Sequence, residues 1–247
     1  RPRTSAPRAR TYEYDLNNRL TLFTDVDGTH TEFTWDGANN KTSERIVNAA
    51  DPNSVRETRY TYDLNNRLVQ QVFDPLGLNI VDSTRYDKVG NVLSVTDGNG
   101  HTIAYTYDLA NRRTSETNAL GHVTSYGYDA VGNRTSVTDA RSVTTTMVYD
   151  RANRLVEERG PTVAIYIIGE GESTQQLITR HVYDALGNEV QTIDAAGNET
   201  TRYFDAAGRR LAELSPDNVL IEWRYNAFGE ISEQTLYMTR LGDAAHD

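Results

Sequence analysis

The sequence predicts an all-β protein built from tandem β-hairpin repeats of about 21 residues. An aromatic residue followed by Asp or Asn recurs ten times in the 247 residues, and six of the nine intervals between copies are 21 residues. A Gly or Asn stands four residues after each of these aromatics. Thr, Val and Tyr fill most positions between the motifs, and these residues favour strands over helices. A fixed period of roughly 20 to 50 residues is typical of a repeat architecture.

The first element of each repeat is a tight turn that begins at the dipeptide. The ten dipeptides are Tyr14-Asp15, Trp35-Asp36, Tyr62-Asp63, Tyr86-Asp87, Tyr107-Asp108, Tyr128-Asp129, Tyr149-Asp150, Tyr183-Asp184, Phe204-Asp205 and Tyr225-Asn226. The residue four positions after the aromatic is Asn18, Asn39, Asn66, Gly90, Asn111, Gly132, Asn153, Gly187, Gly208 or Gly229. Gly and Asn tolerate a positive φ. An Asp side chain accepts hydrogen bonds from the backbone N–H groups that follow it. Both features predict a turn that joins two strands.

The next position carries a side chain that can reach beyond its own turn. It is Arg19, Arg67, Arg112, Arg154 or Arg209 in five repeats, and Asn40, Asn91, Asn133 or Asn188 in four. An Arg at this position can lie along an aromatic ring or pair with the turn Asp, and the sequence leaves both arrangements open.

A second turn is predicted about halfway through the repeat. Its composition is that of a type I or type II turn at residues 25–28, 74–77, 97–100, 118–121, 194–197 and 215–218. Further aromatics stand two residues before the dipeptide, a spacing that places both rings on one face of a strand. They are Tyr12, Phe33, Tyr60, Tyr105, Tyr126 and Trp223. Each repeat is therefore expected to hold two strands and two turns.

The repeat array is predicted to span residues 12–235, between a basic tail of residues 1–11 and a tail of residues 236–247. Extra residues fall near 43–60, 70–84 and 160–181 and are expected to lengthen hairpins. Residues 163–168 are uncharged and prone to form strands. We expect this segment to pack against its own strand partner or a neighbouring part of an assembly. The lack of an initial Met and of an apolar leader predicts a piece of a longer or processed polypeptide.

Composition removes several classes of protein from consideration. The absence of cysteine excludes disulfides and Cys-bound metals. A net charge of −10 argues against a nucleic-acid surface. The longest apolar run, at residues 163–168, is far too short to cross a membrane. No cofactor and no metal ion is expected.

Acidic turns and scattered histidines were weighed as candidate sites. Asp51-Pro52 and Asp74-Pro75 superficially resemble the paired aspartates of a self-cleaving site, but Asp-Pro is also ordinary turn chemistry. Residues 25–28 and 97–100 offer clustered oxygens that could hold calcium, yet neither continues into an EF-hand loop. The histidines at 30, 101, 122 and 181 are interpreted as strand residues. No catalytic residue is predicted.

The units Tyr62-Asp-Leu-Asn-Asn-Arg-Leu68 and Tyr128-Asp-Ala-Val-Gly-Asn-Arg134 resemble the YD repeat of the RHS-repeat (rearrangement hotspot) family. The resemblance covers roughly residues 12–235. It implies a spirally wound β-sheet, with one hairpin per repeat, that forms part of a hollow shell. Such shells enclose a C-terminal toxin in bacterial insecticidal toxin complexes and polymorphic RHS toxins, and a related shell in animal teneurins supports cell adhesion.

The resemblance leaves two functions open for this chain. The first is a non-catalytic wall of a secreted bacterial protein that encloses or scaffolds a toxin or effector, with further repeats or partner subunits beside it. The alternative is an extracellular cell-surface protein of the same fold that supports adhesion or binds glycans on its tyrosine rows. Repeated tyrosines are better explained as a ladder that packs one hairpin on the next. An enzyme is expected only if a region beyond Asp247 supplies the activity.

Overall fold

The computed structural model describes residues 9–168 and 171–237, and this part of the chain contains strands and turns but no helix. The all-β prediction is therefore confirmed. Contacts divide the chain into two units, Arg1–Val123 and Thr124–Asp247. The basic tail predicted for residues 1–11 and the tail predicted for residues 236–247 lie mostly outside the described residues. The described chain holds no helix that is long and apolar enough to cross a membrane.

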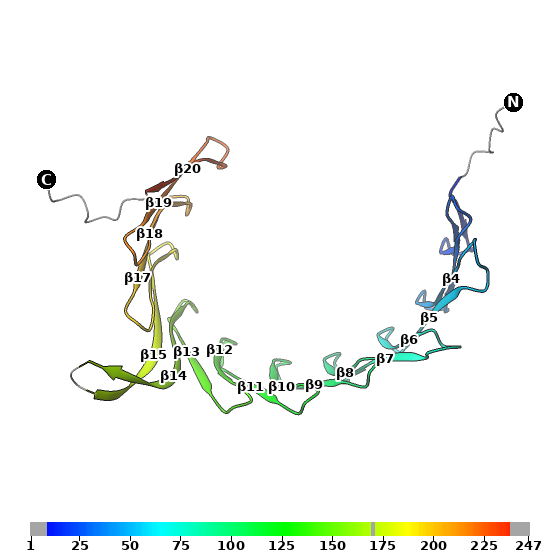
Figure 1. The fold of residues 1–247 in the computed structure, drawn as a ribbon, viewed down its shortest axis with the longest axis horizontal. Helices are drawn as coiled ribbons and strands as arrows, with labels where there is room; N and C mark the ends of the chain where they lie inside the picture. The colour runs from blue at the N-terminus through cyan, green and yellow to red at the C-terminus, as the bar shows by residue number, and fades with distance from the viewer. Residues whose placement is uncertain (1–8, 169–170, 238–247) are drawn as a thin grey trace. The chain divides into compact units, whose positions relative to one another are not determined.

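The first unit is an antiparallel array in which each strand pairs with the next one along the chain (Figure 1). Its strands are β1 (Thr11–Tyr14), β2 (Leu20–Thr24), β3 (His30–Trp35), β4 (Lys41–Val47), β5 (Val55–Tyr62), β6 (Leu68–Phe73), β7 (Ile80–Tyr86), β8 (Val92–Thr96), β9 (Thr102–Tyr107) and β10 (Arg113–Thr117).

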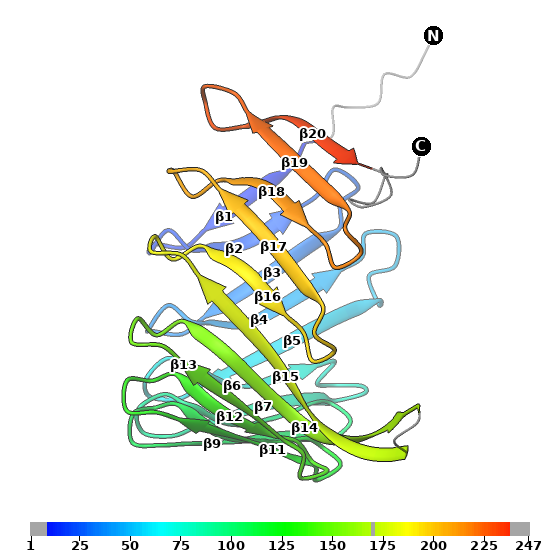
Figure 2. The same ribbon diagram turned by 90° about the vertical axis from the view of Figure 1, so that its left-hand side faces the viewer.

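The second unit repeats this plan, and Figure 2 shows its strands side by side. Its strands are β11 (Val123–Tyr128), β12 (Arg134–Thr138), β13 (Thr144–Tyr149), β14 (Leu155–Ile167), β15 (Gly171–Tyr183), β16 (Glu189–Ile193), β17 (Glu199–Phe204), β18 (Arg210–Leu214), β19 (Leu220–Tyr225) and β20 (Ile231–Tyr237).

The two kinds of turn differ in strand register. At every Tyr-Asp turn the pairing shifts by one residue at the aromatic; for example, Thr61 pairs with Gln70 but Tyr62 pairs with Leu68. A shift of this kind is a β-bulge, which increases the local twist and re-aims side chains. The second turns at residues 25–29 and 97–101 join strands that pair without a shift. The bulge therefore distinguishes one edge of the array from the other.

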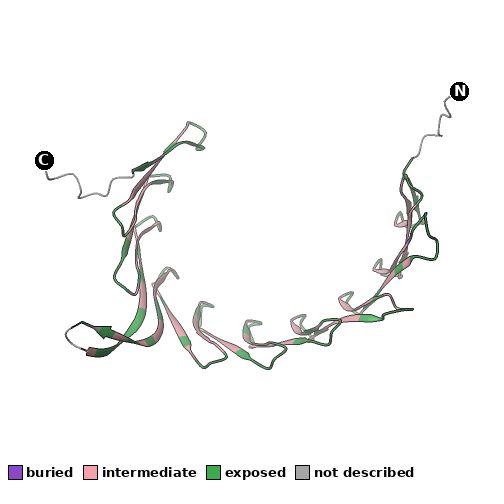
Figure 3. Cartoon of the chain, viewed as in Figure 1, coloured by how far each residue is buried: buried purple, intermediate pink, exposed green. Residues whose placement is uncertain are grey.

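The sheet is a single layer with almost no interior. Among the described residues only Val47 is buried, at 7% exposure, and most strand residues are half-buried (Figure 3). A strand in such a sheet is covered by its two neighbours rather than by a second layer. This explains how a chain with only 37% hydrophobic residues can fold.

The longest hairpin contains the apolar segment of residues 163–168. Strands β14 and β15 have 13 residues each, and Val163, Ile165 and Ile167 pair with Gln175, Ser173 and Gly171. Of the two partners expected for the segment, the structure shows its own hairpin strand. The other extra residues lengthen strands β4 and β5 and form the turn between Phe73 and Ile80.

Candidate functional site

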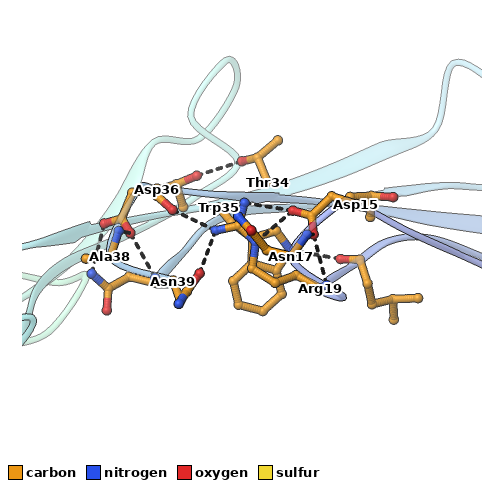
Figure 4. Close-up of polar contacts among 12 residues, drawn as sticks. Asp15, Asn17, Arg19, Thr34, Trp35, Asp36, Ala38 and Asn39 are labelled. Carbon is orange, nitrogen blue, oxygen red and sulfur yellow. Dashed lines mark hydrogen bonds and ion pairs between the residues drawn. The ribbon is translucent and has the colours of Figure 1, made fainter.

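The ten Tyr-Asp turns form the candidate site, because they bring the repeated side chains together at one edge of the strands. In the first turn, Asp15 Oδ1 accepts hydrogen bonds from the backbone N–H groups of Asn17 (2.9 Å) and Arg19 (3.0 Å) (Figure 4). The Asp15 N–H donates in turn to the Arg19 carbonyl at 2.9 Å. All ten turns have this last backbone bond. The carboxylate thus closes the loop with groups that would otherwise lack a partner.

The fourth turn residue takes the left-handed backbone conformation in every repeat. The φ angle is 60° at Asn66 and 104° at Gly132, and it is positive at all ten predicted Gly and Asn positions. Residues with a Cβ reach this region only at a cost, which is smallest for Asn and absent for Gly. The residue choice at this position is therefore explained by the backbone alone.

The Arg that follows the turn makes both of the contacts that the sequence left open. Arg67 Nε donates to Asp63 Oδ2 at 2.7 Å, while its guanidinium lies 4.6 Å from the ring centre of Tyr86 in the next repeat. Nη1 of the same side chain donates to the Asp87 carbonyl at 3.1 Å. One arginine therefore fixes its own turn and joins it to the following turn.

The same arrangement occurs at other arginine turns. Arg19 pairs with Asp15 and donates to the Asp36 carbonyl (2.7 Å) and to Asn39 Oδ1 (2.9 Å), while lying over Trp35 (Figure 4). Arg154 lies 4.7 Å from the Tyr183 ring centre, and Arg209 lies 4.8 Å from that of Tyr225. Distances under about 6 Å between a cation and a ring centre are attractive.

Where Asn replaces Arg, an amide makes a shorter link. Asn40 Nδ2 donates to Asp36 Oδ2 at 2.8 Å and to Asn66 Oδ1 of the next turn at 2.9 Å. Asn91 and Asn133 make the corresponding bonds to Asn111 and Asn153. The Asn version thus keeps the connection from turn to turn but has no cation to lie over a ring.

The key aromatics supply a third link between repeats. The Tyr107 hydroxyl donates to the Val92 carbonyl at 2.9 Å, and the Trp35 ring N–H donates to the Leu20 carbonyl at 2.8 Å. In each case the acceptor lies six residues after the key aromatic of the preceding repeat. Equivalent bonds are made by Tyr62, Tyr86, Tyr149, Tyr183 and Tyr225. Phe204 has no hydroxyl and lacks this bond.

Hydrogen bonding lowers the pKa of the turn aspartates. The backbone N–H of Arg19 is the largest influence that lowers the pKa of Asp15, and the side chain of Arg67 is the largest for Asp63. At Asp87, burial acts to raise the pKa but is outweighed by hydrogen bonds led by that from Asn91. These carboxylates are held ionised as acceptors, which is the state that the turn requires.

The other candidates from the sequence lie in turns or on strands. Asp51 Oδ1 accepts the Asn53 N–H at 3.1 Å, and Asp74 Oδ2 accepts the Leu78 N–H at 2.8 Å. His101 contacts Asp97, and His181 contacts Glu189 at 3.0 Å. Within the described ranges, no group of three or more His, Cys, Asp or Glu residues is arranged to hold a metal.

One turn was missed in the sequence. Residues 139–142 form a second turn in which Asp139 Oδ1 accepts the N–H groups of Arg141 and Val143, and Ser142 has a φ of 63°. Ser at the position of positive φ hid this turn. The period pointed to it, because Asp97, Asn118 and Asp139 are spaced by 21 residues.

Fold and site together define a class: an antiparallel hairpin-repeat protein whose repeats are joined through their Asp turns. The family model described as RHS repeat matches residues 14–50, 86–123, 111–144, 128–162 and 183–220, which is more than half of the chain. The chain therefore belongs to the RHS repeat family, and the resemblance seen in the sequence is confirmed. No curated protein sequence matches the chain significantly.

Solved structures of toxin complexes are among the similar folds. TcdB2–TccC3–Cdc42 is 14% identical, with a TM-score of 0.41 over 92% of this chain and 16% of that chain. The Photorhabdus luminescens Tc holotoxin pore is 13% identical, with a TM-score of 0.41 and the same two coverages. The chain thus spans about one sixth of the length of these toxin-complex chains.

Proposed function

We propose that this chain is a non-catalytic segment of an RHS wall that encloses or scaffolds a toxin or effector polypeptide of a secreted bacterial protein. Family membership supports a structural role built on repeats. The observation that carries the proposal is the single-layer sheet, in which Val47 is the one buried residue among those described. A sheet of this kind has no interior of its own, and both of its faces are free to border another polypeptide or solvent.

The contacts at the Tyr-Asp edge favour a wall over a glycan-binding surface. The Tyr86 and Tyr183 rings lie against arginine, and their hydroxyls donate to backbone carbonyls of the preceding repeat. These groups are engaged within the protein. Their repetition is explained by repeated packing, as in other repeat proteins.

The proposal is tested on the natural polypeptide that contains residues 1–247. We expect single-particle images to show a closed chamber that contains protein density. An open array without enclosed polypeptide would contradict the proposal.

A protease-protection experiment gives a second test. The double substitution Arg67→Ala and Arg154→Ala removes two links between repeats, and we expect it to increase cleavage of the enclosed polypeptide. Arg141→Ala is the matched control, because Arg141 is 84% exposed and pairs with the Asp of its own turn. Equal cleavage in both variants and the parent would argue that the wall does not protect cargo.

A further inference from the structure

The outer part of the β14–β15 hairpin has a strand edge that no other described strand covers. Strand β13 pairs with β14 only from Leu155 to Arg159. Residues 162–167 of β14 continue beyond that pairing, with β15 on one side only. Figure 1 shows this part of the hairpin projecting away from β13 and β16. The N–H and C=O groups on the other side of residues 162–167 form an edge that can accept a further strand.

The two strands of the projecting hairpin differ in chemistry. Residues 160–169 contain no charge, and within them Tyr166 is 73% exposed and Ile168 is 94% exposed. Strand β15 is polar over residues 172–176, and Gln175 Nε2 donates to the Ala195 carbonyl at 2.9 Å. That bond ties the β15 side of the hairpin to a neighbouring turn. The free edge is therefore the apolar one, on β14.

An uncharged, strand-prone edge is normally protected by a charge, a proline or a covering segment. Pro161 lies at the base of the projecting part, before the free edge begins. The outer strands of the array carry an acidic residue instead, Glu13 in β1 and Glu233 in β20. The contrast points to an edge that is kept free of charge because it binds a strand.

We propose that residues 162–167 form a homodimer interface, in which β14 of one chain pairs antiparallel with β14 of a second copy. An antiparallel pair of identical strands is related by a two-fold axis, so one edge can complement itself. Self-pairing here places uncharged residues opposite uncharged residues, whereas β1 or β20 would oppose two glutamates. The paired strand is about 20 Å long. An interface of this size is expected to be weak, with a Kd of roughly 10 µM.

Sedimentation velocity of the 247-residue chain from about 1 to 200 µM tests the proposal. We expect a monomer–dimer equilibrium, and hydrogen exchange that slows with concentration at residues 162–167. Ala164→Lys and Tyr166→Lys change exposed side chains and place like charges across the two-fold axis. Each should weaken the dimer at least tenfold without changing the far-UV circular dichroism of the monomer.

The matched control is Thr174→Lys, because Thr174 is exposed and pairs with Ala164 on the other strand of the same hairpin. Its dimerisation should remain close to that of the parent. Mixing Ala164→Lys with Ala164→Glu should restore a dimer made of one chain of each kind. A monomer at all concentrations would overturn the proposal, as would an association that Ala164→Lys leaves intact or that Thr174→Lys disrupts equally.

Discussion

The two edges of the hairpin array are built from similar turns but are connected differently. At the Tyr-Asp edge, Arg67 bonds to its own turn and also reaches the Asp87 carbonyl and the Tyr86 ring of the next repeat. At the opposite edge, Asn198 Nδ2 donates to Asp194 Oδ2 at 2.8 Å, within the same turn. An Asp, a residue of positive φ and a donor side chain therefore suffice to form a turn on either edge. Joining consecutive repeats requires a longer side chain and a bulge that aims it.

The bulged register explains why the connections gather at one edge. The extra residue at each Tyr-Asp turn increases the twist there. The key aromatic of one repeat then lies beside the position six residues after the preceding aromatic, where Tyr86 meets the Leu68 carbonyl. The second hairpins pair without a shift, as at β8 and β9. One edge thus holds the repeats together, while the other mainly closes the hairpins.

Acid is expected to have the largest effect, because it weakens turns on both edges. The Arg67 side chain lowers the pKa of Asp63, and the His101 backbone N–H leads the influences that lower the pKa of Asp97. Since the folded pKa is lowered, the contribution to stability is complete above the ordinary Asp pKa of about 3.9 and is lost as pH falls through the lowered value. Chemical denaturation from pH 7 to pH 2 should show a constant stability that falls below about pH 4. Stability that is unchanged at pH 2 would contradict this account.

Arginine substitutions separate the two edges most clearly. Arg67→Ala removes a charged hydrogen bond and a ring contact between repeats, and should lower the free energy of unfolding by about 2 kcal/mol. Arg141→Ala, at a second turn, should have no measurable effect, because Arg141 is 84% exposed. Urea denaturation of both variants measures the difference. Equal losses would show that the connection between repeats is not concentrated at the Tyr-Asp edge.

Glycine substitutions should affect both edges equally. Gly132 at a Tyr-Asp turn has a φ of 104° and Gly197 at a second turn has a φ of 83°, with open space around an added Cβ at each. Replacing either by Val should therefore cost about 1–2 kcal/mol from backbone strain alone. Asn66→Gly is the control and should change stability by less than about 0.5 kcal/mol. A much larger loss at Gly132 would reveal packing at that turn beyond the backbone effect.

The smallest effect is expected from single tyrosine hydroxyls. Tyr107→Phe removes the bond to the Val92 carbonyl and should cost about 1 kcal/mol. The reverse change, Phe204→Tyr, adds a hydroxyl at the equivalent position and should stabilise the chain by up to about 1 kcal/mol. Thermal and urea denaturation of the pair test both signs. Destabilisation by Phe204→Tyr would mean that the ninth repeat cannot form the link made by its neighbours.

Much of this fold was predictable because its causes are local. An Asp followed three residues later by Gly or Asn specifies a turn, as at Asp129 and Gly132, whatever surrounds it. The same rule failed at Ser142, where an unfavourable residue adopts a φ of 63°. The contacts of Arg67 were not predictable, because its partners on Tyr86 and Asp87 lie about 20 residues away and the bulge decides their distance.

The sequence by itself determined the strands, the turns, their period and the family, since backbone preferences and side-chain alternation act within a few residues. Only the tertiary structure decided that each arginine serves two turns, and that the apolar strand of residues 162–167 is covered by β15 on one side alone. These depend on register and on the lengths of neighbouring strands. Such quantities arise when hairpins are placed side by side, and no single repeat contains them.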